Sequence, residues 1–338
     1  MFPPLRQRVL LTLAVILGGL ACYAAGLAAA PWDGSSGCSL LFASSWATAL
    51  GAFVVALGVA SVIAAVPAAA GNPLAGPFVL AMCLGVAAVA GGSIEDWIRT
   101  RPTDGSGSGY WVLALETLIW AGLMVLMILV IQVLRQRIAG RIPDVLKRRS
   151  EEERGRQAAW MFESLVLKSP QAGDAAPAAS GVRLKPFGGV WQQIGLSLVI
   201  STVVGGFLIL LLMQWMDPGQ VIFVPLIAFT AGAVAAHQIV QTRIGIGILL
   251  SPLLVGLVGY VVVALTYGND VTALQAAIYG LPGEGRAPAA VLRAALALPI
   301  HYASAGVMGA AMGLGWSQVM FETRIPSASA DGEAAASG

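Results

Sequence analysis

The sequence predicts an all-α membrane protein, a polytopic helical bundle of about eight transmembrane helices. Of its 338 residues, 57% are hydrophobic and 11% are charged, whereas a soluble domain carries about 25% charge. Apolar runs of about eighteen residues or more recur along the chain, and each can cross a hydrocarbon core of roughly 30 Å. One polar and strongly basic stretch, residues 135–187, separates these runs into two membrane blocks.

This division gives the chain four parts. They are a first membrane block at residues 1–134, a basic cytoplasmic segment at 135–187, a second membrane block at 188–325 and a tail at 326–338. The tail is mainly Ser, Ala and Gly, and we expect it to be disordered. The two blocks share one loop plan, which leaves open whether they are two four-helix halves related as a parallel repeat.

The first block contains four predicted spans, at residues 9–30, 46–66, 77–92 and 110–134. The first span follows Arg6 and Arg8, a pattern that also occurs in cleaved signal peptides. We interpret it as a retained helix, because an apolar run of about 19 to 22 residues is long for a signal peptide. The second span is expected to end at Pro67, since proline removes a helix hydrogen bond.

The second block contains four more predicted spans, at residues 188–213, 221–239, 244–267 and 290–316. Residues 214–219 are typical of a tight turn between the first two of these spans. Pro225 is expected to interrupt the sixth span, and Pro299 is expected to kink the eighth by freeing a backbone carbonyl.

Basic residues predict the orientation of the bundle. Eleven of the 19 Lys and Arg residues lie in the stretch 135–187, and eight spans would place Arg6, Arg8, Arg243 and Arg324 on the same side. Because Lys and Arg concentrate in cytoplasmic segments, both termini and the basic stretch are predicted to be cytoplasmic. The expected location is the cell membrane, of the bacterial inner-membrane type, with the chain crossing it several times.

The basic stretch holds its own predicted helix, at residues 144–168, with Trp160, Met161 and Phe162 in its second half. One interpretation is an interfacial helix that binds anionic lipid or docks a cytoplasmic or membrane protein partner. The alternative is an ordinary inner loop whose charges follow the positive-inside rule. No motif indicates a nucleic-acid partner, so the lipid bilayer and a protein are the partners considered.

Ionisable residues inside membrane spans are costly, which makes each of them a candidate site. The candidates are Glu116 in the fourth span, His237 in the sixth, and Arg293 and His301 in the eighth. In one hypothesis they form a proton-coupled path, in which Arg293 tunes Glu116 and His237 is the inner exit. In the other, Glu116 pairs with Arg293, and each histidine donates to a backbone carbonyl of a neighbouring helix. The sequence leaves both hypotheses open.

Small residues predict close helix packing. Ala305, Gly309 and Gly313 recur at every fourth position of the eighth span, a spacing that lets two helix backbones approach closely. Gly256 and Gly259 are expected to do the same in the seventh span. Such positions also occur in broken helices around a substrate, so tight packing and a binding role are both consistent with them.

Several function classes lack their signatures in this chain. There is no phosphate-binding loop, no zinc-protease motif and no nucleophile elbow, and no cofactor or metal site is predicted. The sequence favours a transporter or permease-like component for a small or apolar solute, with proton coupling through the candidates above. The alternatives are a non-catalytic membrane subunit that docks a partner through the helix at 144–168, and a membrane-embedded lipid-modifying enzyme.

Overall fold

We describe the fold from a computed structural model of the chain. The structure describes residues 5–29, 39–43, 45–70, 73–90, 108–139, 189–214, 217–240, 245–267 and 293–322. The regular elements in these ranges are helices, and six of them are long and apolar enough to cross a membrane. These helices indicate a multi-pass membrane protein, in agreement with the predicted fold class.

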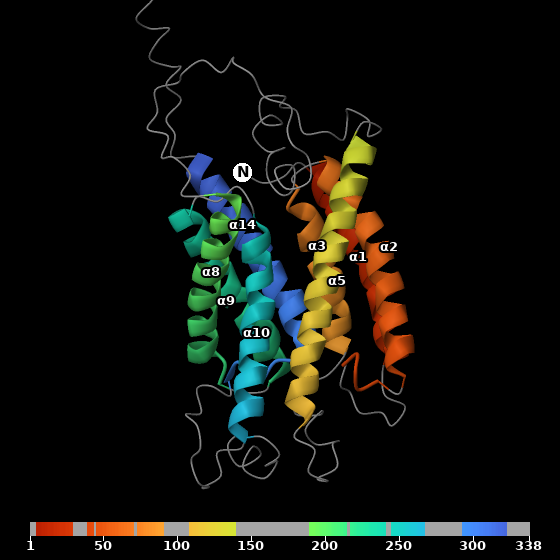
Figure 1. Ribbon diagram of the computed structural model, residues 1–338. Coiled ribbons are helices and arrows are strands. Elements are labelled where there is room, and N and C mark those ends of the chain that lie inside the picture. Colours follow the sequence, from red (N-terminus) through yellow and green to blue (C-terminus); the bar gives the residue numbers. More distant parts are fainter. Residues whose placement is uncertain are drawn as a thin grey trace, which may run out of the picture.

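The first half of the bundle, shown in red to yellow in Figure 1, comprises α1 (Leu5–Ala29), α2 (Trp46–Ala70), α3 (Ala75–Ala90) and α5 (Ser108–Ala139). All but α3 are among the six long apolar helices. With 16 residues, α3 rises about 24 Å at 1.5 Å per residue, which is shorter than a hydrocarbon core of roughly 30 Å.

The second half, shown in green to blue, comprises α8 (Val190–Leu212), α9 (Pro218–Val240), α10 (Ile246–Tyr267) and a last helical run. This run, called the α13–α14 run below, consists of α13 (Pro299–His301), the π-helix η1 (Tyr302–Gly306) and α14 (Val307–Glu322). Figure 1 shows the two halves side by side; the α13–α14 run begins in the middle of the molecule, beside the first half, and α14 slants to the upper left behind α8.

The same packing pattern occurs in both halves. In the first half, α1 packs against α2 and α3, and α2 packs against α5. In the second half, α8 packs against α9 and α10, and α9 packs against α14. The halves meet where α5 packs against α10 and where α3 packs against η1 and α14. By this pattern α3 corresponds to α10, and α5 corresponds to α14. The α5–α10 contact and the α3–α14 contact are therefore equivalent, as a two-fold arrangement requires.

Two proline predictions were wrong. Helix α2 continues through Pro67 to Ala70, and α9 continues through Pro225 without interruption. Inside a membrane bundle, neighbouring helices and local adjustments can satisfy the backbone groups that a proline frees, so the helix need not end. Helix α9 also begins earlier than predicted, at Pro218, where the Asp217 side chain accepts a hydrogen bond from the Gly219 N–H.

The predicted start of the eighth span was also wrong. Residues 294–298 are not helical, although each of their side chains is buried, and the helix begins only at Pro299. Leu298 is extended, with φ −72° and ψ 157°, because the residue before a proline is disfavoured in the helical region. Proline suits the first helical position, where its missing N–H costs nothing. Pro299 therefore starts this helix instead of kinking it.

Glycines bring α14 against the backbone of α9, as the spacing of small residues predicted. A Cβ atom on Gly309 would collide with the Leu226 carbonyl group, and one on Gly313 would collide with the Thr230 carbonyl group. The Thr230 hydroxyl donates to the Leu226 carbonyl of its own helix at 2.7 Å and shares this proton with the Gly309 carbonyl of α14 at 3.2 Å. Close backbone contact and hydrogen bonding of this kind drive helix association in lipid.

Candidate functional site

The Glu116 carboxylate lies fully buried on α5 and is surrounded by hydrogen-bond donors. The Ser39 hydroxyl donates to one carboxylate oxygen, and the Trp120 Nε1–H donates to the other at 3.2 Å. The backbone groups of Leu40 and Leu41 also bond to this carboxylate. Glu116 thus holds the short segment 39–43, which precedes α2, against α5.

Arg293 bonds elsewhere. Its guanidinium donates to the Leu210 carbonyl at 2.7 Å, in the last turn of α8. The contacts of Glu116 and of Arg293 are therefore separate, and the hypothesis that they form a buried pair gains no support. Each residue bonds within its own half: Glu116 of α5 bonds to the segment that precedes α2, and Arg293 bonds to the last turn of α8.

The non-helical segment 294–298 is held by two buried tyrosines. The Tyr260 hydroxyl of α10 donates to the Ala297 carbonyl, and the Tyr302 hydroxyl of η1 donates to the Ala294 carbonyl at 2.6 Å. A Cβ on Gly259 would lie 3.0 Å from the Ala294 Cβ, so glycine lets this segment approach α10. Buried carbonyls without a helix partner thereby gain donors, which a lipid-filled environment requires.

His301 closes the first turn of the α13–α14 run. Its Nδ1 accepts a hydrogen bond from the Leu298 N–H at 3.1 Å, which caps the start of the helix. Its side chain also bonds to the backbone of Ala88 in α3. Because Nδ1 is an acceptor, the neutral ring carries its proton on Nε2, the nitrogen that can donate to the Ala88 carbonyl. The predicted contact of His301 with a neighbouring backbone carbonyl is consistent with this geometry.

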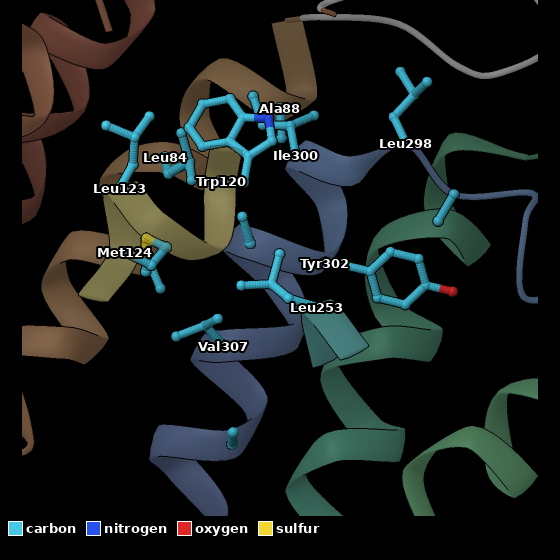
Figure 2. Packing of buried hydrophobic residues seen from close by; sticks show 14 of the residues in the cluster. Leu84, Ala88, Trp120, Leu123, Met124, Leu253, Leu298, Ile300, Tyr302 and Val307 are labelled. Atoms are coloured by element: carbon cyan, nitrogen blue, oxygen red, sulfur yellow. The ribbon is translucent and has the colours of Figure 1, made fainter. Parts of the chain in front are cut away.

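Aromatic rings fill the contact between the halves. Figure 2 shows Trp120 of α5 close to Ile300 and Ala88 on one side of the α13–α14 run, while the Tyr302 ring lies on the other side. The Tyr302 ring meets the Tyr260 ring edge-on, with centroids 6.5 Å apart. Tyr260 is also close enough to Glu116 to interact with it electrostatically. The carboxylate, the tyrosines and the non-helical segment are thus neighbours.

His237 belongs to a different contact. Its Nδ1 lies 2.8 Å from the Ser317 hydroxyl, where α9 packs against α14. Ser317 continues the small-residue spacing of Gly309 and Gly313, so this bond extends the close α9–α14 contact. Of the predicted site residues, the structure brings Glu116 and His301 to the contact between the halves and places His237 within the second half.

Sequence reasoning missed Ser39, Tyr260 and Tyr302, and it assigned Trp120 no role. Tyrosine and serine carry no charge at neutral pH, so they are not among the ionisable residues that are costly inside a membrane. One signal was present: Trp120 follows Glu116 by four residues, which places the two side chains on one helix face. The partnership of Tyr260 with residues near 297 joins distant parts of the chain and has no local signature.

The predicted partner surface of Trp160, Met161 and Phe162 lies outside the described residues, as do the rest of the helix at 144–168 and the tail at 326–338. Where the predicted basic segment overlaps the described chain, α5 extends through Arg135 and Arg137 to Ala139. Within the described ranges, no group of three or more His, Cys, Asp and Glu residues could hold a metal ion.

Comparison of the chain with protein families, with characterised proteins and with solved structures finds no match.

Proposed function

We propose that the chain is a membrane transporter for a small or apolar solute, coupled to proton movement. In this proposal α3 and the α13–α14 run also cross the membrane, which gives eight spans in two four-helix halves. Both termini and the basic segment lie in the cytoplasm, and the membrane is a bacterial-type cell membrane. The solute path runs between the halves, past Glu116 and the non-helical segment 294–298.

The observation that carries the proposal is buried non-helical backbone inside an apolar bundle, next to a buried carboxylate. At membrane depth, irregular backbone is tolerated only inside protein or beside a water-filled cavity. Discontinuous helices of this kind form the substrate sites of many transporters, because freed backbone groups can bind the solute. A carboxylate in the same place can exchange a proton when the site opens to water.

The test is proton movement in reconstituted vesicles that enclose a pH-sensitive dye. Panels of small neutral and amphipathic solutes are added outside, and the internal pH is followed for the wild type, Glu116→Gln and Asp217→Asn. Asp217 is the matched control, because it is an exposed carboxylate at the start of α9. We expect a solute-dependent pH change with the wild type and Asp217→Asn, and none with Glu116→Gln.

Two outcomes would contradict the proposal. If no solute changes the internal pH with the wild type, proton-coupled transport is wrong. If correctly folded Glu116→Gln behaves like the wild type, Glu116 has no part in the path. Folding is checked by circular dichroism and by elution as a single species from a size-exclusion column.

A second candidate function is a non-catalytic membrane subunit. The observation that favours it is that protein donors already surround the Glu116 carboxylate, as they would a structural residue. In this case we expect the Glu116→Gln variant to fail to fold. The amide N–H groups of glutamine would face Ser39 and Trp120, which are themselves hydrogen-bond donors. Loss of folding in Glu116→Gln, together with a wild type that moves no protons, would favour the subunit.

A further inference from the structure

The forces that hold helices together in lipid differ from those in water. Lipid tails are as apolar as leucine, so apolar contact between helices has no hydrophobic driving force there. Close backbone packing and hydrogen bonds remain as the stabilising contacts. Where these two kinds of contact lie in the bundle therefore indicates which helices move together.

Close backbone packing is found inside the halves. In the first half, a Cβ on Gly18 of α1 would lie 2.6 Å from the Cys83 sulfur of α3. In the second half, a Cβ on Gly232 of α9 would lie 2.9 Å from the Ser201 carbonyl oxygen of α8. A Cβ at Gly232 would push α8 away from α9, whereas a Cβ at Gly18 would displace the Cys83 side chain and lie 3.5 Å from the Ala60 Cα of α2.

Glycines at the contact between the halves have more room. A Cβ on Gly85 of α3 would lie 3.9 Å from the Ser304 Cβ of η1. One on Gly315 of α14 would lie 4.0 Å from the Leu74 side chain, next to α3. These are ordinary van der Waals distances. The backbones of the two halves thus approach each other less closely at these positions than the helices within a half do.

In the described part of the chain, several interhelical side-chain hydrogen bonds fall inside the halves. Such bonds join Gln7 to the Ala70 carbonyl, Ser201 to Ser251, Thr230 to the Gly309 carbonyl, and His237 to Ser317. Between the halves, the His301 side chain bonds to the backbone of Ala88. An interhelical hydrogen bond of this kind contributes about 0.6 kcal/mol in a membrane protein, so breaking it costs little.

We propose that the two halves move against each other as rigid bodies, and that the contacts of α3 with the α13–α14 run and of α5 with α10 are the surfaces that part. This inference rests on the transporter proposal, since the motion would open the solute path at Glu116 and segment 294–298. The matched packing of the halves supports it, because an alternating-access carrier built from two similar bodies can rock about the contact between them.

The first test is a disulfide across the moving contact, in a chain with Cys22, Cys38 and Cys83 replaced by alanine. Gly85→Cys with Ser304→Cys links α3 to η1, because their Cβ separation of 3.9 Å lies in the disulfide range of roughly 3.5–4.5 Å. The control, Gly26→Cys with Ala87→Cys, links α1 to α3 inside the first half at 3.5 Å. We expect oxidation by copper phenanthroline to lower solute-driven proton flux at least tenfold in the Gly85→Cys, Ser304→Cys variant and to leave the flux of the control variant unchanged. Reduction by dithiothreitol should restore the flux.

The second test measures the motion without flux. Spin labels at Leu27 of α1 and Leu265 of α10 report the distance between halves, while labels at Leu27 and Leu115 of α5 report a distance inside the first half. All three side chains are exposed on the described bundle. Double electron–electron resonance in lipid nanodiscs is expected to show two distances for the first pair and one for the second.

The outcomes separate this inference from the transporter proposal. Two distances between the halves without proton flux would support the motion and contradict the transport. Flux that survives the Gly85–Ser304 disulfide, together with one narrow distance for both label pairs, would overturn the motion and leave the transport intact.

Discussion

A methyl group added at Gly309 is expected to destabilise the bundle by about 1–3 kcal/mol, the usual cost of overpacking a well-packed core. The new Cβ would lie 2.9 Å from the Leu226 carbonyl carbon and 3.0 Å from the Leu226 Cα. The Leu226 carbonyl oxygen would lie nearer still, and a carbon–oxygen contact needs roughly 3.2 Å, so α14 must move away from α9 by about one ångström. That shift stretches the 3.2 Å bond from Thr230 to the Gly309 carbonyl beyond a useful length of roughly 3.5 Å.

The matched control is Gly122→Ala on α5, where a Cβ meets nothing within 4 Å. Alanine is a better helix former than glycine by about 1 kcal/mol, so this control is expected to be neutral or more stable than the wild type. Because this gain in helix propensity applies at both positions, the two variants should differ by roughly the overpacking cost of 1–3 kcal/mol. The assay is reversible unfolding by dodecyl sulfate in mixed micelles, followed by circular dichroism. If Gly309→Ala is as stable as Gly122→Ala, the close α9–α14 contact is absent in the folded protein.

Two further predictions concern buried hydrogen bonds. A double-mutant cycle of His237→Ala and Ser317→Ala, measured by the same unfolding assay, is expected to give a coupling energy of about 0.6 kcal/mol; additive effects would exclude their hydrogen bond. Tyr260→Phe leaves the buried Ala297 carbonyl without its donor and should cost about 1–3 kcal/mol. Hydrogen exchange in residues 294–298 should become faster in this variant, whereas the exposed Tyr23→Phe on α1 should change neither quantity.

The helical membrane class and most helix positions were predictable from the sequence, because they depend on local composition. A long apolar run needs no partner to identify it as a span. The stripe of Ala305, Gly309 and Gly313 was predictable for the same reason, since residues four positions apart lie on the same face of a helix. Which helix this face meets was not predictable, because any neighbour with accessible backbone would suit it.

The candidate site was predictable only in part. Charge identified Glu116, because a buried carboxylate is costly wherever the chain places it. The sequence could not assign its partners, since Ser39 carries no charge and lies far from Glu116 in the chain, and only packing brings its hydroxyl to the carboxylate. The start of the last helix shows a similar limit. Pro299 was visible, but whether it kinks or begins a helix depends on whether the preceding segment finds donors elsewhere.

The sequence by itself determined that this protein is a bundle of apolar helices, with a basic segment between two blocks and few ionisable residues inside them. The physical reason is that transfer into lipid is decided residue by residue along the chain. The tertiary structure alone decided that the helices form two similarly packed halves and that segment 294–298 is buried without being helical. It also decided that Glu116 and Arg293 each bond within their own half. These features depend on contacts between residues far apart in the chain, and hydrophobicity, which is nearly uniform over the spans, carries no information about such pairings.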